Sequence, residues 1–544
     1  MTLRGLMMEQ PLLISSLIDY AAAQYGDVEI VSRSVEGPFH RYTYADAARR
    51  SRQLAQALMG LGIGPGDRVA TLAWNTYRHF ELYYGVSGCG AVCHTVNPRL
   101  FRDQVIYIVN HAADRIIFTD LTFVPLLEDL WEKLETPEAV VVMTDAAHMP
   151  DSSLPKLLCY EDLIEAQPET FDWPRLDERS ASALCYTSGT TGEPKGALYD
   201  HRSAVLHALG VIAHMDGSFT SRDSFLVIVP MFHVCAWGFP YIAPLVGAKM
   251  VFPGPGYDGA SLHELFESEE VTISAGVPTI WLGLLDYLRE NGKRLSHLKV
   301  ALCGGASPAR ALIREIEDMG IRFIQGWGMT ETSPVAALSI LRRSMQGADL
   351  EARVDKVAKP GWPPFGIDLK IVDDAGEVLL HNGEESGELL VRGHWVISGY
   401  YENAAATDAA MEEGWFRTGD VANIDSDGFL QITDRAKDLI KSGGEWISSI
   451  DLENAAMGHP SVAQAAAIAM PHRNWQERPM LVVIPREGAA LDKDELLSFL
   501  ADKVAKWWLP DDVVFVDSLP MTATGKVSKA RLREQFKGHR LPNA

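Results

Sequence analysis

The sequence predicts an α/β protein in which parallel sheets covered by helices precede an antiparallel β unit and a small α+β segment. Three observations support this prediction. Short apolar runs alternate with helical patterns up to about residue 360, which indicates parallel strands joined by helices. Beyond that point the strand patterns become short and alternating, and glycine-rich turns separate them. From residue 434 onward roughly 110 residues remain, the size of a small domain.

The first part of the chain begins with a helical pattern at residues 12–24. A second amphipathic helix is predicted at residues 43–61, and Thr43 can cap its first turn. Short apolar runs predict buried strands at residues 68–72, 116–118, 139–143, 225–229, 249–252, 300–303 and 321–324. Because such strands alternate with helices, we expect ligands to bind at the carboxyl ends of the strands.

The later part of the chain contains strand patterns at residues 368–372 and 388–391, and a hairpin centred on Asp427-Gly428. Asn423, Asp425 and Asp427 also resemble half of a calcium loop, but the flanks alternate like strands, so the hairpin is favoured. The last segment is predicted to contain helices and strands in this order: helix 451–457, strands 465–469 and 480–484, helix 494–506 and strand 513–516.

Charge and cysteine usage exclude several functional classes. Lys+Arg 49 against Asp+Glu 72 gives a net charge of −23, which disfavours nucleic acid and anionic membranes as partners. The six cysteines form no Cys-x-x-Cys pair, so neither a zinc site nor a disulfide framework is indicated. No run of 18 apolar residues and no signal-peptide core occur. We therefore expect a soluble, cytoplasmic protein without a membrane span.

Residues 186–196 (YTSGTTGEPKG) form the most distinctive stretch. Three glycines, four aliphatic hydroxyls and Lys195 follow the apolar run 183–185. Glycines let backbone N–H groups converge on an anion, hydroxyls add donors, and a lysine supplies positive charge. The stretch therefore predicts a polyphosphate site, although it is not a Walker A loop. The alternative interpretation is a polar turn on the surface.

Several further blocks follow predicted strands, and each alone could be a solvated turn. Gly304 and Gly305 would allow a flat ligand to approach the backbone, and Glu331 with neighbouring hydroxyls could complete a Mg²⁺ site. Asp420 lies in a glycine turn of the kind that holds a ribose diol. Lys526 lies on a flexible loop near the C-terminus. The aromatic block 230–238 contains His233, which in isolation is better explained as a buried core histidine.

In order and spacing, these blocks resemble the adenylate-forming superfamily of acyl-CoA ligases, firefly luciferases and peptide-synthetase adenylation domains. The resemblance covers essentially the whole chain. It implies an N-terminal adenylation domain at residues 1–436 with two doubly wound sheets and a β-barrel at about residues 360–433. It also implies a mobile C-terminal lid domain at residues 437–544, use of ATP, Mg²⁺ and coenzyme A, and a homodimer.

The resemblance also implies roles for individual residues. Lys526, Thr187, Glu331 and His233 would be catalytic, with Thr187 and Glu331 holding Mg²⁺. The ATP site would comprise Thr187, Ser188, Gly189, Thr190, Thr191, Gly192, Lys195, Gly304, Gly305, Ala306, Gln325, Gly326, Trp327, Gly328, Thr330, Asp420, Arg435 and Lys526. The acyl pocket would comprise His233, Trp237, Val277 and Trp446. The hinge and the coenzyme A site would comprise Lys437, Lys441, Ser442, Gly443, Gly444 and Trp395.

The substrate prediction starts from the aromatic block. Amino-acid-activating relatives place an aspartate where this chain has His233, and no acidic residue occurs between Pro230 and Met250. A buried ammonium would lack a partner here, so an amino acid is a poor fit. The chain looks similar to fatty acyl-CoA ligases, and within that group to bacterial 3-methylmercaptopropionate–CoA ligases of dimethylsulfoniopropionate degradation. A short acid is therefore favoured.

Three alternatives stay open from the sequence. The first is a medium- or long-chain fatty acyl-CoA ligase, the second is an enzyme that delivers acyl groups to a carrier protein, and the third is a non-catalytic nucleotide-binding module.

Two positions depart from the family pattern. Cys235 replaces an asparagine, which puts any hydrogen bond from that position in doubt, and Asp200 replaces Ser or Thr. Asp200 is expected to cap the following helix.

Overall fold

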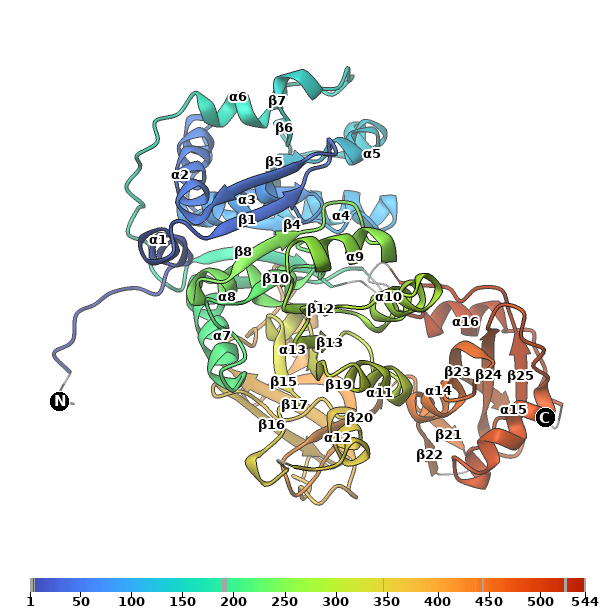
Figure 1. The fold of residues 1–544 in the computed structure, drawn as a ribbon. Coiled ribbons are helices and arrows are strands. Elements are labelled where there is room, and N and C mark those ends of the chain that lie inside the picture. The colour runs from blue at the N-terminus through green and yellow to red at the C-terminus, as the bar shows by residue number, and fades with distance from the viewer. Residues whose placement is uncertain are drawn as a thin grey trace.

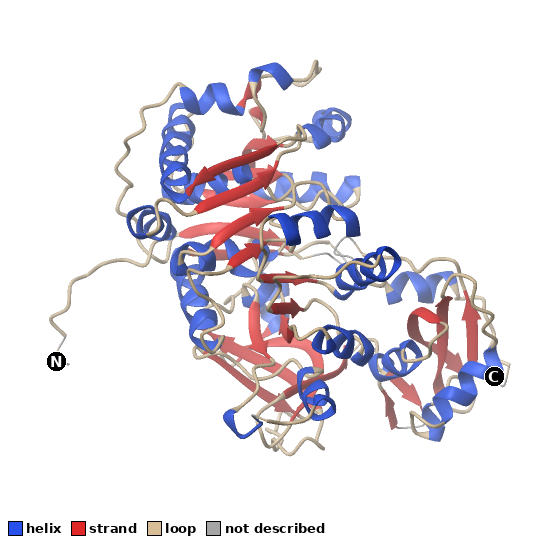
Figure 2. Ribbon diagram, viewed as in Figure 1, coloured by secondary structure: helices blue, strands red, loops and turns tan. Residues whose placement is uncertain are grey.

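The computed structural model describes residue 3 and residues 5–187, 193–345, 347–435, 437–442, 445–522 and 526–542. Two large sheets form the centre of the molecule, a five-stranded sheet lies beside them, and the C-terminal residues form a separate sheet to one side (Figures 1 and 2). The prediction of an α/β protein with a smaller α+β C-terminal part is confirmed.

The first large sheet has seven strands, all parallel to their neighbours except the edge pair β8–β9. In order across the sheet they are β7 (Leu157–Cys159), β6 (Ala139–Val142), β5 (Asp114–Thr119), β3 (Arg68–Leu72), β4 (Val92–Thr95), β8 (Ala181–Tyr186) and β9 (Gly196–Asp200). The helices of this part are α1 (Ile14–Gln24), α2 (Tyr44–Gly60), α3 (Tyr77–Gly88), α4 (Arg102–Ala112), α5 (Val124–Leu130) and α6 (Tyr160–Glu165).

Both faces of this sheet are buried, which explains why its strands read as continuous apolar runs. In β3, Val69 joins the central hydrophobic core, whereas the next residue, Ala70, packs in the core beneath α4 and α5. In β6, Val141 likewise joins the central core, and Val140 packs in the core beneath α4 and α5. The alternation follows from the two-residue period of a strand, and it places helices on both sides.

The second large sheet has eight strands, and its only antiparallel pairs are the edge pairs β14–β15 and β1–β2. In order they are β15 (Val335–Leu338), β14 (Arg322–Gly328), β13 (Val300–Cys303), β12 (Ile273–Gly276), β10 (Ser224–Leu226), β11 (Lys249–Phe252), β1 (Glu29–Arg33) and β2 (Phe39–Thr43). Its helices are α7 (His201–His214), α8 (Phe239–Val246), α9 (Gly259–Ser268), α10 (Pro278–Asn291), α11 (Arg310–Asp318) and α12 (Leu350–Val357).

The third sheet lies where the β-barrel was predicted. It contains five antiparallel strands: β16 (Ile367–Val372), β17 (Gly387–Gly393), β18 (Met411–Glu412), β19 (Trp415–Ile424) and β20 (Leu430–Arg435), with α13 (Ala404–Ala410) between β17 and β18. The predicted hairpin is confirmed, because Ile424 pairs with Leu430 across the turn. Asp425 in this turn accepts hydrogen bonds from the backbone of Asp427 and Phe429 and pairs with Lys359 at 2.8 Å.

The C-terminal sheet has its own hydrophobic core. Its strands are β21 (Ile440–Ser442), β22 (Glu445–Ile447), β23 (Val462–His472), β24 (Gln476–Pro485) and β25 (Asp512–Phe515), and its helices are α14 (Ser449–Met457), α15 (Lys493–Ala501) and α16 (Lys529–Gln535). The helix predicted at residues 494–506 is too long, since α15 ends at Ala501 and a short 3₁₀ turn, Lys506–Trp508, follows.

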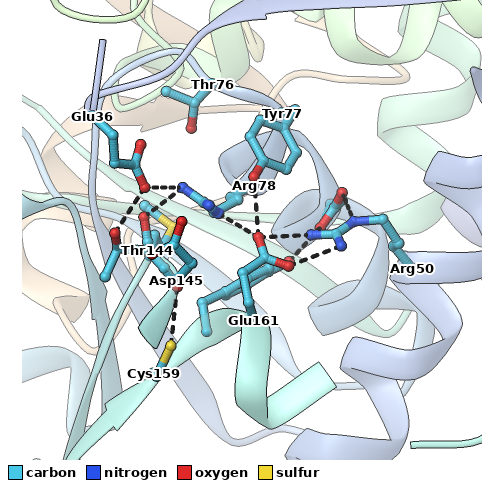
Figure 3. Close-up of polar contacts among 12 residues, drawn as sticks. Glu36, Arg50, Thr76, Tyr77, Arg78, Thr144, Asp145, Cys159 and Glu161 are labelled. Carbon is cyan, nitrogen blue, oxygen red and sulfur yellow. Dashed lines mark hydrogen bonds and ion pairs between the residues drawn. The ribbon is translucent and has the colours of Figure 1, made fainter. Parts of the chain in front are cut away.

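A buried ionic network joins helices that pack in the central core, between the two large sheets (Figure 3). Arg50 of α2 binds Glu81 and Glu161, with N–O distances of 2.7 and 2.9 Å. Arg78 of α3 binds Glu161 and Glu36, both at 2.7 Å. The network therefore connects α2, α3, α6 and the β1–β2 turn, which carries Glu36.

Local signals at helix starts agree with the structure. Thr43 accepts a hydrogen bond from the Asp46 backbone while the Asp46 side chain bonds back to Thr43, a complete capping box. Asp200 caps α7 by accepting the Ser203 N–H at 2.6 Å, as predicted. In the described part of the chain, no helix has the length and apolar character needed to cross a bilayer.

Candidate active site

A cavity of about 1020 Å³ lies where strands of the second sheet end. Its lining includes Gly276, the last residue of β12, and Gly328, the last residue of β14. Cys303 at the end of β13 and the following Gly304 also line it. Carboxyl ends of parallel strands are the usual position of ligands in α/β sheets, and the cavity lies where the sequence predicted a ligand site. The C-terminal domain contributes Lys526 to the same cavity.

The glycine- and hydroxyl-rich stretch connects two antiparallel strands, β8 and β9. The Thr187 N–H donates to the Lys195 carbonyl at 2.9 Å, and the Lys195 N–H donates to Thr187 Oγ1 at 3.1 Å. These two bonds close the base of the loop, and both side chains line the cavity. Ser188, Gly189, Thr190, Thr191 and Gly192 lie outside the described residues.

Glu331 lies in a short 3₁₀ turn, Thr330–Thr332, directly after β14, and is only 6% exposed. Its Oε1 accepts a hydrogen bond from the Tyr400 hydroxyl at 2.6 Å. The Lys195 ammonium lies over the Tyr400 ring, 4.9 Å from its centroid. Tyr400 was not among the predicted site residues, yet it contacts both Lys195, predicted to bind phosphate, and Glu331, predicted to bind Mg²⁺.

Asp420, Arg435 and Trp327 form a second cluster beside the cavity. Asp420 and Arg435 are paired residues of β19 and β20, and the Arg435 Nε lies 2.7 Å from Asp420 Oδ1. The Trp327 indole donates to Asp420 Oδ2 at 2.9 Å. Arg435 and Trp327 line the cavity, and the buried Asp420 carboxylate holds both in place.

Two glycines at the end of β13 let the walls of the cavity approach closely. A Cβ at Gly304 would lie 2.9 Å from the Trp237 ring and 3.0 Å from the Gly326 carbonyl, so nothing larger fits without movement. Gly305 has φ +80°, which glycine adopts without strain. A Cβ there would lie 3.2 Å from Val277 and 3.7 Å from Lys526 Cε.

Lys526 and His233 both titrate away from their ordinary range in this cavity. Burial and the nearby Arg435 charge together lower the pKa of Lys526 to about 8, against the opposing effect of the Asp420 and Glu331 carboxylates. Burial together with the Lys526 charge lowers the pKa of His233 to about 3. At neutral pH the cavity therefore holds a protonated lysine beside a neutral histidine.

The aromatic block turns sharply at the cavity wall. Val234, Cys235, Ala236 and Trp237 all have φ between 46° and 54°, and Gly238 continues with φ 84°. Non-glycine residues rarely adopt this conformation, and runs of it are costly. The turn directs His233 and Trp237 into the cavity. Beyond them the wall is apolar, with lining side chains from Val211, Phe219, Phe239, Ile242, Val335 and Leu338.

The cavity brings together most of the predicted site. Its lining includes Thr187, Lys195, His233, Trp237, Val277, Gly304, Gly305, Gly326, Trp327, Gly328, Thr330, Glu331, Arg435, Lys437 and Lys526. Ala306 is exposed next to Gly305, and Gln325 is buried with its amide facing the Val357 and Ala358 carbonyls. Neither of these two residues is part of the described lining.

Four residues predicted for the acyl and coenzyme A sites lie away from the described lining. Trp446 is 48% exposed, and the Lys441 ammonium lies over its ring. Ser442 is buried and accepts a hydrogen bond from Arg478. Trp395 is buried and donates to the Val335 carbonyl at 2.9 Å. Gly443 and Gly444 are outside the described residues. The roles of these residues stay predictions.

The oxygen donors at Thr187 and Glu331 fit Mg²⁺, a hard cation that prefers oxygen ligands. Glu331 is a buried carboxylate whose bond to Tyr400 involves one oxygen, and the other oxygen accepts no hydrogen bond from the residues that the structure describes. Among the described residues, no group of three or more His, Cys, Asp or Glu side chains could hold a metal. The donor set thus matches an ion that takes its other ligands from substrate phosphates and water.

Comparison with known proteins identifies the family. The AMP-binding enzyme family matches residues 18–401, and the AMP-binding enzyme C-terminal domain matches residues 451–526. The chain belongs to the AMP-binding enzyme family. The predicted resemblance and the predicted enzyme class are confirmed by this match and by the relatives that follow.

Two curated relatives and one solved structure show how close the likeness is. The chain is 48% identical to a 3-methylmercaptopropionyl-CoA ligase of Ruegeria pomeroyi, over 98% of this chain and 99% of the relative. It is 45% identical to a medium-chain-fatty-acid–CoA ligase of Ectopseudomonas oleovorans, over 98% and 97%. A solved anthranilate CoA ligase, 23% identical, matches the fold with a TM-score of 0.86 over 97% of this chain and 98% of that chain.

Proposed function

We propose that this AMP-binding enzyme, an ATP- and Mg²⁺-dependent acid–CoA ligase, acts on 3-methylmercaptopropionate or a short-chain fatty acid. In the first step the acid carboxylate attacks the α-phosphate of ATP and releases pyrophosphate. In the second step the coenzyme A thiol attacks the acyl adenylate and releases AMP. The same enzyme therefore uses one cavity for two half-reactions.

The observation that carries the proposal is the convergence of Lys526, Lys195 and Glu331 on one cavity that also has an apolar wall. Bringing a carboxylate to a polyphosphate joins two anions, and fixed cations offset their repulsion. Lys526, protonated at neutral pH, would contact the α-phosphate and the acid. Losing such a contact typically costs on the order of 3 kcal/mol of transition-state stabilisation.

Each of the remaining groups has a proposed task. Thr187 and Lys195 would orient the β- and γ-phosphates as the leaving group, and Gly304–Gly305 with Gly326–Gly328 would frame the adenine. Asp420 and Arg435 would hold the ribose. Glu331 and Thr187 would hold Mg²⁺, which when bound neutralises phosphate charge. Neutral His233 and Trp237 would form the neck of the acyl pocket, where a charged imidazolium would be costly.

The choice of acid rests on the aromatic block and on the relatives. No carboxylate of the described lining comes from residues 230–250, so a substrate ammonium would have no partner in that wall. The relative with 48% identity is a 3-methylmercaptopropionyl-CoA ligase, which favours a short thioether acid. The medium-chain relative at 45% identity is nearly as similar, so a medium-chain fatty acid is the second candidate.

The proposed domain division places residues 1–436 in the adenylation domain and residues 437–544 in a mobile lid. Lys437 lies between β20, which ends at Arg435, and β21, which begins at Ile440. Rotation about Lys437 would withdraw Lys526 after the first half-reaction and open a path for coenzyme A. A hinge of this kind lets one site perform two steps.

The decisive experiment compares kcat/KM for 3-methylmercaptopropionate with that for straight-chain acids of increasing length. AMP release that requires coenzyme A is expected with the short acids. A steep preference for chains beyond about eight carbons would instead identify a medium- or long-chain enzyme. Consumption of acid and ATP without consumption of free coenzyme A would identify transfer to a carrier protein.

Assembly and location complete the proposal: we expect a homodimer in the cytoplasm. Resemblance to fatty acyl-CoA ligases supports the dimer, and exposed large apolar side chains such as Phe365 (89% exposed) provide surface that a partner could cover. Light scattering on the purified protein at micromolar concentration measures the oligomeric state directly. A mass equal to one chain of 59.9 kDa would contradict the dimer.

A further inference from the structure

Tyr400 occupies the space between two opposite charges of the candidate active site. Its hydroxyl donates to Glu331 Oε1 at 2.6 Å, and its ring faces the Lys195 ammonium at 4.9 Å. All three side chains line the same cavity. Within the part of the chain that the structure describes, Lys195 and Glu331 form no ion pair with each other, although both are charged groups in a shielded site.

The backbone fixes Tyr400 to both of its partners. The Ile397 N–H donates to the Glu331 carbonyl, and the Tyr401 N–H donates to the carbonyl of Gly196, the residue after Lys195. The Tyr400 N–H itself donates to Thr407 Oγ1 of α13 at 2.9 Å. The segment 397–401 is therefore attached on one side to the turn that carries Glu331 and on the other to the strand that follows Lys195.

A direct Lys195–Glu331 ion pair would work against ligand binding. Opposite charges attract strongly away from bulk water, and an ATP–Mg²⁺ complex would have to break that pair before it could contact either group. A phenol can satisfy both charges more weakly, because its hydroxyl donates to the carboxylate while its ring face attracts the ammonium. The ATP–Mg²⁺ complex then has to displace only the two contacts of the phenol, which are weaker than a salt bridge between Lys195 and Glu331.

We infer that Tyr400 is a positioning residue that keeps Lys195 and Glu331 apart, so that Lys195 is available to the ATP phosphates and Glu331 to Mg²⁺. This inference rests on the proposed function for the identity of the ligand. It adds a residue that neither the sequence motifs nor the family resemblance indicated. Tyr400 acts through its two neighbours and needs no contact with the reacting atoms.

Two substitutions separate the two contacts of Tyr400. Tyr400→Phe keeps the ring under Lys195 and removes the hydroxyl that holds Glu331. Tyr400→Leu removes both contacts and lets Lys195 approach Glu331. Tyr401→Phe is the matched control, because the Tyr401 ring packs against His111, 5.7 Å between centroids, and its side chain is not part of the described cavity lining.

Calorimetric titration of the full-length protein with ATP, in excess EDTA and then in excess Mg²⁺, provides a readout that does not depend on the acid. For Tyr400→Phe we expect ATP affinity in EDTA to equal that of the wild type, and the gain in affinity from Mg²⁺ to fall about tenfold. For Tyr400→Leu we expect ATP affinity in EDTA to fall as well. Tyr401→Phe should match the wild type in both conditions.

The inference is overturned if Tyr400→Phe shows the full Mg²⁺ effect, or if Tyr400→Leu binds ATP in EDTA as tightly as Tyr400→Phe does. Thermal melting of each variant shows whether the fold is intact. Because Tyr400→Phe loses only one oxygen atom, this variant keeps the test valid if Tyr400→Leu does not fold. Failure of the proposed function is a separate result, namely normal ATP binding by the wild type with no pyrophosphate release from any acid.

Discussion

At the scale of single residues, the protonation of Lys526 is the property most open to measurement. Burial and the charge of Arg435 lower its pKa to about 8, from an ordinary value of 10.5. The protonated form predominates below that pH and is lost as pH rises through it. In the proposed reaction the ammonium, and not the neutral amine, would stabilise the charge that develops on the α-phosphate.

We therefore predict that kcat/KM for pyrophosphate release declines above about pH 8, because this quantity reports ionisation of the free enzyme. Lys526→Arg, whose guanidinium stays charged, should retain part of the activity and show no decline near pH 8. Pyrophosphate release across pH 6.5 to 10 (roughly the range in which the fold should survive) is the measurement. An identical decline in the wild type and Lys526→Arg would assign the ionisation to another group.

At the scale of elements, the connection between β20 and β21 contains contacts that cross the proposed hinge. Asp434, before Lys437, accepts hydrogen bonds from the Ser449 N–H at 2.7 Å and from Ser449 Oγ at 2.5 Å. Lys529 of α16 donates to the same Ser449 hydroxyl. If residues 437–544 turn as proposed, these bonds would limit the rotation and concentrate it near Lys437.

Lys437→Pro should slow thioester formation from supplied acyl adenylate at least about tenfold more than it slows pyrophosphate release, because proline fixes φ at the pivot. Separate assays of the two half-reactions make the comparison. Lys437→Ala, which keeps backbone freedom, is the matched control and should leave the ratio of the two rates near that of the wild type. An unaffected second half-reaction in Lys437→Pro would remove Lys437 from the hinge role.

The buried network of Figure 3 makes a prediction about stability. Arg50→Met leaves the fully buried Glu81 (0% exposed side chain) without its cation, and breaking a buried pair in this way typically costs about 3–5 kcal/mol. Arg49→Met, on the same helix, removes an exposed pair with Asp46 and should cost no more than about 1 kcal/mol. Urea denaturation curves of both variants give the difference.

The pH dependence of this effect has a defined sign. Without Arg50, Glu81 is a buried carboxylate whose pKa in the folded state lies above its pKa in the unfolded state. The free-energy cost of burying the charged carboxylate is therefore absent below the unfolded-state pKa and grows as pH rises. The stability difference between Arg50→Met and the wild type should therefore be larger at pH 8 than at pH 5. Equal differences at both values would mean that another group, such as Tyr160, compensates for the lost charge.

These elements also show which parts of the fold could be predicted from the sequence. Strands 68–72, 249–252 and 300–303 were predicted with the observed bounds, because apolar runs between turn signals are local patterns. The partners of Arg50 were not predicted, because a charged residue on an amphipathic helix usually faces solvent. Tyr400 was missed since Lys195, Glu331 and Tyr400 are far apart in sequence, and only the folded chain shows that they meet.

At the scale of the whole molecule, the hydrophobic cores divide along the sequence. The buried clusters of the three N-terminal sheets contain residues from Ile14 to Leu430, and the clusters of the C-terminal sheet contain residues from Ile440 to Leu541. Among the described residues, none is a buried member both of a cluster that ends before residue 431 and of a cluster that begins after residue 439. Each part thus has apolar surface of its own to bury, which is the condition for independent folding.

We therefore predict that residues 1–436 fold without the lid, melt cooperatively and bind ATP, but release pyrophosphate at least about 100-fold more slowly, because Lys526 is absent. Full-length Lys526→Ala is the matched control: it keeps the lid and should show the same loss of pyrophosphate release. Calorimetric melting and ATP titration measure folding and binding, and a pyrophosphate assay measures the reaction. A fragment that does not melt cooperatively, beside a normally folded Lys526→Ala protein, would show that the lid is required for folding and that the two parts are not independent domains.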